Sequence, residues 1–357
     1  MNASAISPPT ESRPSERVGL ASVTRYLLLV VALWFLCTRF SWIEVWRTIL
    51  ALNVSYVVPV VILLTPLSVV LRSYRWRALM PQGSLIPLRN YIRAYLIGVL
   101  ANAILVGKLG DIVKARVLCR GNVRMGHSLG SAILDRLIEG ALLLIIVAFA
   151  LATTPGLPPW TMRLAVTSGV LTLLALAVVY ASVCQRFRVT ALIDRVLSHA
   201  PGFVRRTFDG QAARLLDGLS GITQHRRVAV AFGWNCLVWT VEVLAVVAFL
   251  KAFAIHVPLL LAALIVLLAL NFGTLLPVAP GNIGLYQLLC VVALSIWGVR
   301  REVAVSFGVV MQAVLFLPVY VAGAICIFVW RDVDATAASA PVAAQDPVLC
   351  TERAAEP

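Results

Sequence analysis

The chain of 357 residues is 61% hydrophobic and only 13% charged, with a net charge of +14 at pH 7. A soluble domain carries about 25% charged residues, so a soluble fold of this composition could not cover its apolar faces with polar surface. In membrane proteins an excess of Arg and Lys collects in cytoplasmic segments, which accounts for the positive charge without a nucleic-acid partner. We therefore predict a multi-pass protein of the cytoplasmic (inner) membrane.

Long apolar stretches recur along the whole chain and predict an all-α, polytopic helical membrane bundle with about seven to nine hydrophobic segments. A helix needs about 20 mostly apolar residues to cross a bilayer. Stretches of about that length predict helices at 21–38, 54–72, 129–152, 162–183, 228–250, 257–276 and 303–330. We expect one transmembrane domain over residues 21–330, between disordered tails at 1–20 and 331–357.

Two further apolar segments, 94–107 and 285–298, are too short for a simple crossing. A 14-residue helix reaches only about 21 Å, less than the ~30 Å hydrocarbon core. The first segment lies between the basic segments 72–93 and 108–124, which the charge rule places on the same, cytoplasmic side. A re-entrant hairpin fits this pattern; the alternative is a full crossing with misplaced charge. We therefore expect two re-entrant or broken segments.

The largest polar segment, 184–227, is strongly basic and has Leu and Val at helical spacing. These features predict a cytoplasmic amphipathic helical linker. The loops 153–161 and 251–257 carry almost no charge, so we place them on the opposite side of the membrane.

The first polar constellation follows the first short apolar segment. Asn102 stands near the end of that segment, and Lys108, Asp111 and Lys114 come after it. Such a group could bind a phosphate or a lipid headgroup, or it could anchor the turn at the membrane surface.

Two further constellations are ionisable residues inside predicted membrane helices. Asp135, Arg136 and Glu139 lie in the first half of helix 129–152, and Glu242 lies deep in helix 228–250. A charge inside a membrane helix costs about 2.5–3.5 kcal/mol even on the most lenient scale. These residues therefore indicate either a function or a buried interhelical partner.

The last constellation is a break rich in Pro and Gly that contains Pro280, Gly281 and Gly284 and follows Asn271. Backbone groups freed by such a break inside a membrane must be shielded or must bind a ligand. We predict that this break and the one at 102–111 lie together and line one cavity, as in transporters built from two halves. Chance similarity of the two breaks is the alternative to an internal duplication.

The sequence has no nucleotide-binding loop, no catalytic motif and no cysteine or histidine spacing typical of a metal site. We therefore expect no cofactor, no metal and no enzymatic activity.

The motifs taken together resemble the membrane domain of lysylphosphatidylglycerol synthase and its flippase-like relatives, over about residues 20–330. The matching positions, in chain order, are Arg72, Arg75 and Trp76; Asn102, Gly110, Asp111 and Lys114; Asp135, Arg136 and Glu139; and Pro277, Pro280, Gly281 and Gly284. Three positions depart from the family pattern: Val106 replaces a Pro, Gln287 a Glu and Gln312 an Arg. If the family uses the charges at 287 and 312 for proton or headgroup coupling, the substrate or activity is altered in this chain.

The resemblance implies a lipid flippase or related transporter for an anionic, modified or isoprenoid-type lipid. The aminoacyl-transferring domain of the synthases has no counterpart here, so lipid movement rather than aminoacylation is implied. Alternatives are a membrane partner that docks a lipid- or glycan-modifying enzyme through segment 184–227, and an intramembrane enzyme. The expected substrate-binding residues are Arg75, Asn102, Lys108, Asp111, Lys114, Asp135, Arg136, Glu139, Glu242, Asn271, Pro280, Gly281 and Gly284.

Overall fold

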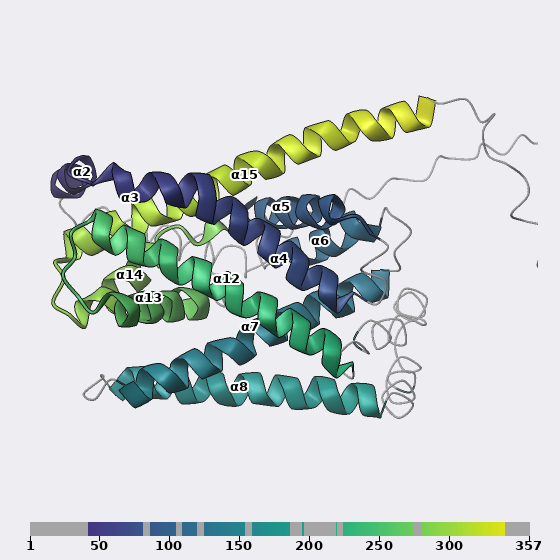
Figure 1. The fold of residues 1–357 in the computed structure, drawn as a ribbon, viewed down its shortest axis with the longest axis horizontal. Helices are drawn as coiled ribbons and strands as arrows, with labels where there is room; N and C mark the ends of the chain where they lie inside the picture. Colours follow the sequence, from purple (N-terminus) through teal and green to yellow (C-terminus); the bar gives the residue numbers. More distant parts are fainter. Residues whose placement is uncertain are drawn as a thin grey trace, which may run out of the picture.

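The computed structural model describes most of the predicted membrane domain, and its described residues form helices without any strand (Figure 1). The all-α prediction is therefore confirmed for this part of the chain. The predicted helix 21–38, nearly all of the linker 184–227 and most of both tails lie outside the described residues. The described residues are 42–80, 86–104, 109–119, 125–153, 159–185, 195, 219, 224–273 and 280–339.

Three helices in the described part are long and apolar enough to cross a membrane: Val54–Leu79, His225–Ala252 and Arg301–Phe328. The first consists of α3 (Val54–Pro59), a wider π-helical turn (Val60–Leu64) and α4 (Thr65–Leu79). The other two are α12 (His225–Ala252) and the first part of α15 (Arg301–Ser339). They confirm the helical membrane bundle.

The predicted end of helix 54–72 is wrong, because α4 continues to Leu79. Arg72 and Arg75 therefore lie inside a helix, not in a cytoplasmic loop. The error arose because Arg residues usually flank membrane spans. Here two of them point into the bundle, where carboxylates neutralise them.

α7 (Met125–Thr153) and α8 (Pro159–Cys184) pack side by side along one flank of the bundle (Figure 1). With 29 and 26 residues, both are longer than the roughly 20 residues that a crossing needs. They match the predicted helices 129–152 and 162–183. α2 (Trp42–Leu50) was not predicted, since it is too short to cross; it lies against the start of α15.

The first short segment forms a hairpin of α5 (Leu88–Ile104) and α6 (Gly110–Cys119), which pack closely on each other. Their 17 and 10 residues reach about 26 and 15 Å, short of a ~30 Å hydrocarbon core. Both outer ends lie at the same end of the bundle (Figure 1), so the hairpin geometry predicted from charge is confirmed. The expected loop 108–124 was wrong in one respect, because it contains α6.

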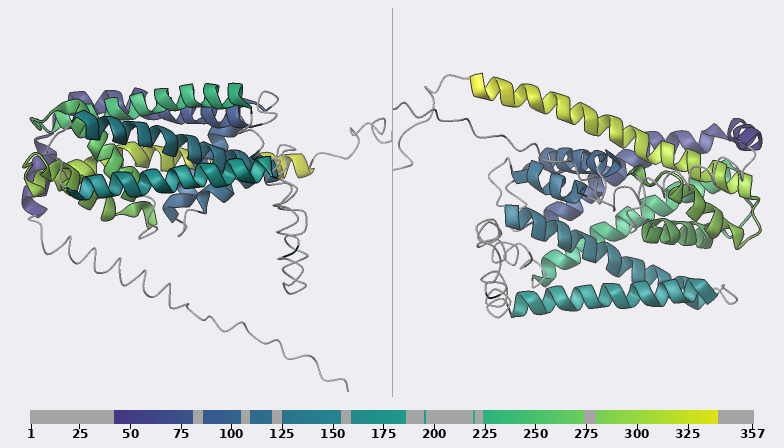
Figure 2. Two further views of the ribbon diagram at one scale, coloured as in Figure 1. Left: turned by 90° about the horizontal axis from the view of Figure 1, so that it is seen from below. Right: turned by 180° about the vertical axis from the view of Figure 1, so that it is seen from behind.

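A second hairpin enters from the opposite end of the bundle, as both views of Figure 2 show. It consists of α13 (Leu259–Gly273), the 3-10 turn η4 (Pro280–Asn282) and α14 (Leu285–Ser295). We predicted a full crossing at 257–276, and this was wrong: α13 has 15 residues, about 22 Å, and packs on α14 as a hairpin. A helix that is apolar all round can be buried in protein as readily as in lipid.

The basic segments 72–93, 108–124 and 184–227 all adjoin helix ends at one end of the bundle, the end from which the first hairpin enters (Figure 1). This placement agrees with the charge-based topology. The side of the membrane that this end faces stays a prediction. The largest apolar core lies toward the other end, where α12, α13, α14 and α15 bury Phe249, Leu294, Phe307 and Met311.

Candidate functional site

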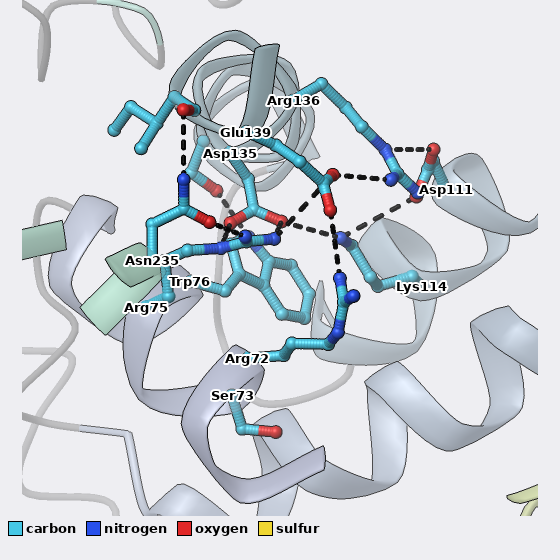
Figure 3. Close-up of polar contacts among 12 residues, drawn as sticks. Arg72, Ser73, Arg75, Trp76, Asp111, Lys114, Asp135, Arg136, Glu139 and Asn235 are labelled. Atoms are coloured by element: carbon cyan, nitrogen blue, oxygen red, sulfur yellow. Dashed lines mark hydrogen bonds and ion pairs between the residues drawn. The ribbon is translucent and has the colours of Figure 1, made fainter. Parts of the chain in front are cut away.

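Eight ionised side chains from α4, α6, α7 and α12 form one continuous network, and Figure 3 shows seven of them, all except Glu242. Helical spacing gathers them: residues three or four apart share a face, as Arg72 and Arg75 do on α4 and Asp135 and Glu139 on α7. Four cations face four carboxylates, so the network is electrically neutral. Its members are Arg72, Arg75, Lys114 and Arg136, and Asp111, Asp135, Glu139 and Glu242.

The most buried part of the network is centred on Arg75. Its guanidinium binds both oxygens of Asp135, at 2.7 and 3.2 Å, and also donates to the amide oxygen of Asn235. Asn235 in turn donates to the carbonyl of Ile138 at 3.1 Å. The side chain of Arg75 is 1% exposed and that of Asp135 6%. This fully paired group joins α4, α7 and α12, and it is an interhelical tie rather than an open binding site.

Lys114 is also enclosed. Its ammonium lies 3.6 Å from carboxylate oxygens of both Asp111 and Asp135, and 4.6 Å from the centre of the Trp76 ring. A cation over an aromatic face is stabilised by the ring quadrupole. The indole of Trp76 donates to Ser131 at 2.9 Å, which fixes the orientation of the ring. Lys114 therefore holds α6 of the first hairpin against α4 and α7.

The remaining charged residues form the accessible part of the network. Arg72 binds Glu139 at 3.0 Å and also binds Glu242. Arg136 binds Glu139 at 2.9 Å and both oxygens of Asp111, at 3.1 and 3.2 Å. Within this part, exposure ranges from 12% for the Glu139 side chain to 51% for Arg136. These side chains can exchange their present partners for a ligand. Arg75 cannot do so without breaking its buried contact with Asp135, which joins α4 to α7.

A cavity of about 310 Å³ lies beside this accessible part, where the tips of the two hairpins come together. Its charged lining residues are Arg72, Arg136, Glu139 and Glu242. Its remaining lining is mostly apolar, together with amide and phenol side chains from both halves of the chain. The polar members of that group are Asn102, Asn271, Asn282, Gln312, Tyr95, Tyr286 and Tyr320.

The tip of the first hairpin is closed by Asn102. Its side-chain oxygen accepts a hydrogen bond from the backbone N–H of Gly110 at 2.8 Å, which satisfies a donor at the start of α6. A Cβ on Gly110 would lie 2.1 Å from the carbonyl oxygen of Gly98. Only glycine lets the two helices approach this closely, so Asn102 shapes the tip as well as lining the cavity.

The tip of the second hairpin is closed by two glutamines. Gln287 accepts from the N–H of Gly284 and donates to Gln312, both at 2.8 Å, and Gln312 donates to the carbonyl of Gly281 at 2.7 Å. Gly281 and Gly284 have φ values of +62° and +86°, which suit glycine. Two of the three departures from the family pattern, Gln287 and Gln312, are thus bonded to each other and form one neutral unit.

This pairing predicts that the two positions change together. Gln312→Arg alone should place an uncompensated cation in the bundle, and Gln287→Glu alone an uncompensated anion, each costing on the order of 2–3 kcal/mol. The double variant should recover most of that loss, because the two charges neutralise each other. Thermal unfolding of the purified wild type, both single variants and the double variant measures the coupling. Additive losses would show that the glutamines act independently.

The two breaks meet, as predicted: η4 contacts α5, and a Cβ on Gly281 would lie 4.0 Å from the carbonyl oxygen of Ala103. Six of the predicted substrate-binding residues line the shared cavity: Asn102, Arg136, Glu139, Glu242, Asn271 and Gly281. Arg75, Asp111, Lys114 and Asp135 are instead behind it, in the ion-pair network. Pro280 begins η4, Gly284 belongs to the second tip and is not among the described lining residues, and Lys108, Val106 and Pro277 lie outside the described residues.

Sequence reasoning missed Arg72 as a site residue, although its position three residues before Arg75 places both on one helical face. The charged residues described around the cavity are balanced in sign. Its charged lining is two arginines and two glutamates, and Lys114 is buried at 5% exposure among carboxylates. Charge signs can be counted from a sequence, but the partner of each charge depends on the fold.

The family comparison agrees with these motifs. The model of the lysylphosphatidylglycerol synthase TM region matches residues 22–323, which is most of the chain. No curated protein and no solved structure matches it. The matched segment contains both hairpins, the ion-pair network and the cavity between them. The chain is a membrane protein and belongs to the lysylphosphatidylglycerol synthase TM-region family.

Proposed function

We propose that the protein is a lipid flippase of the cytoplasmic membrane, which moves a polar lipid headgroup past the hydrocarbon core without covalent chemistry. The observation that carries this proposal is the cavity with ionised and amide side chains in its lining, between two hairpins that enter the bundle from opposite ends. Hydrocarbon offers a headgroup no hydrogen-bond partner, and each unsatisfied polar group costs several kcal/mol there. A cavity with ionised and amide side chains supplies those partners inside the bundle.

The arrangement also supports access from either end. Binding sites of many transporters lie where broken helices of two halves meet, and one half moves against the other around the bound substrate. The first hairpin is held to α7 by the partly exposed pair of Arg136 and Asp111, and the second to α15 by Gln287 and Gln312. A headgroup that competes for Arg136 would loosen the first hairpin from α7 and open the cavity toward that end.

Arg136 provides the test. We expect Arg136→Gln to lose most lipid movement while the protein stays folded, because Arg136 is half exposed and lines the cavity. Purified protein is reconstituted into liposomes that carry fluorescent phospholipids labelled on an acyl chain. Dithionite added outside then reports how fast labelled lipid reaches the outer leaflet.

The matched control is Arg300→Gln. Arg300 also binds a carboxylate, that of Glu44 at 2.7 Å, but it is 69% exposed and lies outside the cavity lining. We expect this variant to move lipid at the wild-type rate. Equal rates of lipid movement for Arg136→Gln and Arg300→Gln would show that the cavity does not take part in transport. Wild-type protein that moves no lipid at all would end the flippase proposal, and docking of a lipid- or glycan-modifying enzyme would then lead.

A further inference from the structure

The ionised side chains that line the cavity carry both signs in equal number. Among the described lining residues these are two arginines, Arg72 and Arg136, and two glutamates, Glu139 and Glu242. The far wall adds neutral amides and phenols, those of Asn271, Asn282, Gln312, Tyr286 and Tyr320. The cavity therefore has no surplus charge with which to neutralise a ligand.

A purely anionic headgroup fits this cavity poorly. To bind Arg72 it must displace Glu139 or Glu242, which are Arg72's partners in the structure. The displaced carboxylate, only 12% or 21% exposed, would then be left beside the ligand's negative charge. Breaking a buried ion pair from one side leaves an uncompensated charge, and this is its main cost. A purely cationic headgroup meets the same difficulty at the arginines.

A headgroup with one anionic and one cationic group avoids that cost. Its phosphate can replace the carboxylates on Arg72 and Arg136, while its ammonium takes over Glu139 and Glu242. Each ion pair is then exchanged for another, and no charge is left unpaired. The chain Glu242–Arg72–Glu139–Arg136 alternates in sign, so adjacent positive and negative sites lie side by side.

The size of the cavity adds a second restriction. About 310 Å³ is at the lower end of small-molecule sites. It can hold a compact headgroup while the acyl chains stay outside. A neutral sugar headgroup would fit the volume, but it has no charge with which to replace a partner in the ion pairs that line the cavity.

We infer that the substrate of this cavity is a lipid with a compact zwitterionic headgroup, one phosphate-type anion and one ammonium-type cation. This inference rests on the proposed flippase function, which by itself leaves the headgroup charge open. It is narrower than the resemblance, which implies an anionic, modified or isoprenoid-type lipid.

The experiment compares four acyl-labelled lipids in the liposome assay: phosphatidylethanolamine, phosphatidylglycerol, a diacyl trimethylammonium lipid and a glucosyl diacylglycerol. We expect wild-type protein to move the zwitterionic lipid at least roughly tenfold faster than the other three, because each of those leaves a charge unpaired or unused. Equal rates, or a faster rate for any of the other lipids, would overturn the inference and leave the flippase proposal intact.

Charge variants make the test specific to the cavity. Glu242→Gln should shift the preference toward phosphatidylglycerol, and Arg72→Gln toward the trimethylammonium lipid. The double variant is neutral again and should return the preference to phosphatidylethanolamine, even at a lower overall rate. Leu244→Val, an exposed position on the same helix as Glu242, is the control and should keep the wild-type preference. Variants that leave the order of the lipids unchanged would refute the charge-balance argument.

Failure of transport can be separated from failure of the inference. If no lipid moves, the flippase proposal fails, and binding is measured instead by the thermal stability of the purified protein. Dihexanoyl phosphatidylethanolamine should then raise the melting temperature more than dihexanoyl phosphatidylglycerol does. Equal shifts of the melting temperature, or a larger shift with dihexanoyl phosphatidylglycerol, would overturn the inference of a zwitterionic headgroup independently of transport.

Discussion

Asp135→Asn is expected to destabilise the protein by about 3–5 kcal/mol, the usual effect of removing one partner of a buried ion pair. Asp135 binds Arg75 through both carboxylate oxygens and also lies 3.6 Å from the ammonium of Lys114. Arg75 is 1% exposed, so its guanidinium cannot turn to water when the carboxylate loses its charge. Thermal unfolding of the purified protein, followed by gel filtration of the folded fraction, measures the loss.

The control is Glu44→Gln, which removes the carboxylate bound by Arg300 at 2.7 Å. Both of these side chains are well exposed, at 44% and 69%, so the loss should stay below about 1 kcal/mol. A second comparison is Arg75→Met combined with Asp135→Leu. This variant removes both charges and should be more stable than Asp135→Asn alone. If Asp135→Asn is as mild as Glu44→Gln, the pair is not the interhelical tie described above.

The prediction of the first hairpin succeeded because of where its charges lie. Basic residues flank α5 and α6, and two basic flanks cannot easily lie on opposite sides of a membrane. The second hairpin has no such marker, since 251–257 carries only Lys251 as a charge. Its apolar length alone suggested a crossing, because burial in protein and burial in lipid require the same kind of side chain.

Part of the candidate site could also be predicted from the positions of its charges. The cost of charge in a membrane singled out Asp135, Arg136, Glu139 and Glu242, and all four belong to the network. Which of them are enclosed and which face a cavity depends on the position of α4, whose helix continues past the predicted end. Arg72 was assigned to a flanking loop on that account. Without its positive charge, the neutrality of the cavity could not be recognised.

The departures from the family pattern at Gln287 and Gln312 also could not be interpreted without the fold. Gln287 and Gln312 are 25 residues apart, and the sequence alone presents them as two separate losses of charge. The fold places them in direct hydrogen-bond contact at the second tip. These two losses of charge are therefore one neutral replacement, which keeps the hairpin attached to α15 and leaves the charge of the cavity to Arg72, Arg136, Glu139 and Glu242.

Gly110→Val is expected to open the tip of the first hairpin and to destabilise the protein by about 3 kcal/mol, the upper range for overpacking. A Cβ at this position would lie 2.1 Å from the carbonyl oxygen of Gly98 and 2.5 Å from the Asn102 side chain. The neighbouring atoms include backbone, so rotation of a side chain cannot relieve the clash. The hydrogen bond from the Gly110 N–H to Asn102 would be lost as α6 moves away from α5.

Gly233→Ala serves as the control, because a Cβ there meets no atom within 4 Å and the residue lies inside α12. It should be neutral, or stabilising by up to about 1 kcal/mol through the higher helix propensity of Ala. Melting temperatures of both variants are compared with wild type. The Gly110 variant should also move lipid more slowly in liposomes at a temperature where it is still folded, because Asn102 and Ala103 of the displaced tip line the cavity. A stable Gly110→Val protein with wild-type transport would show that close contact at this tip is not required for either stability or lipid movement.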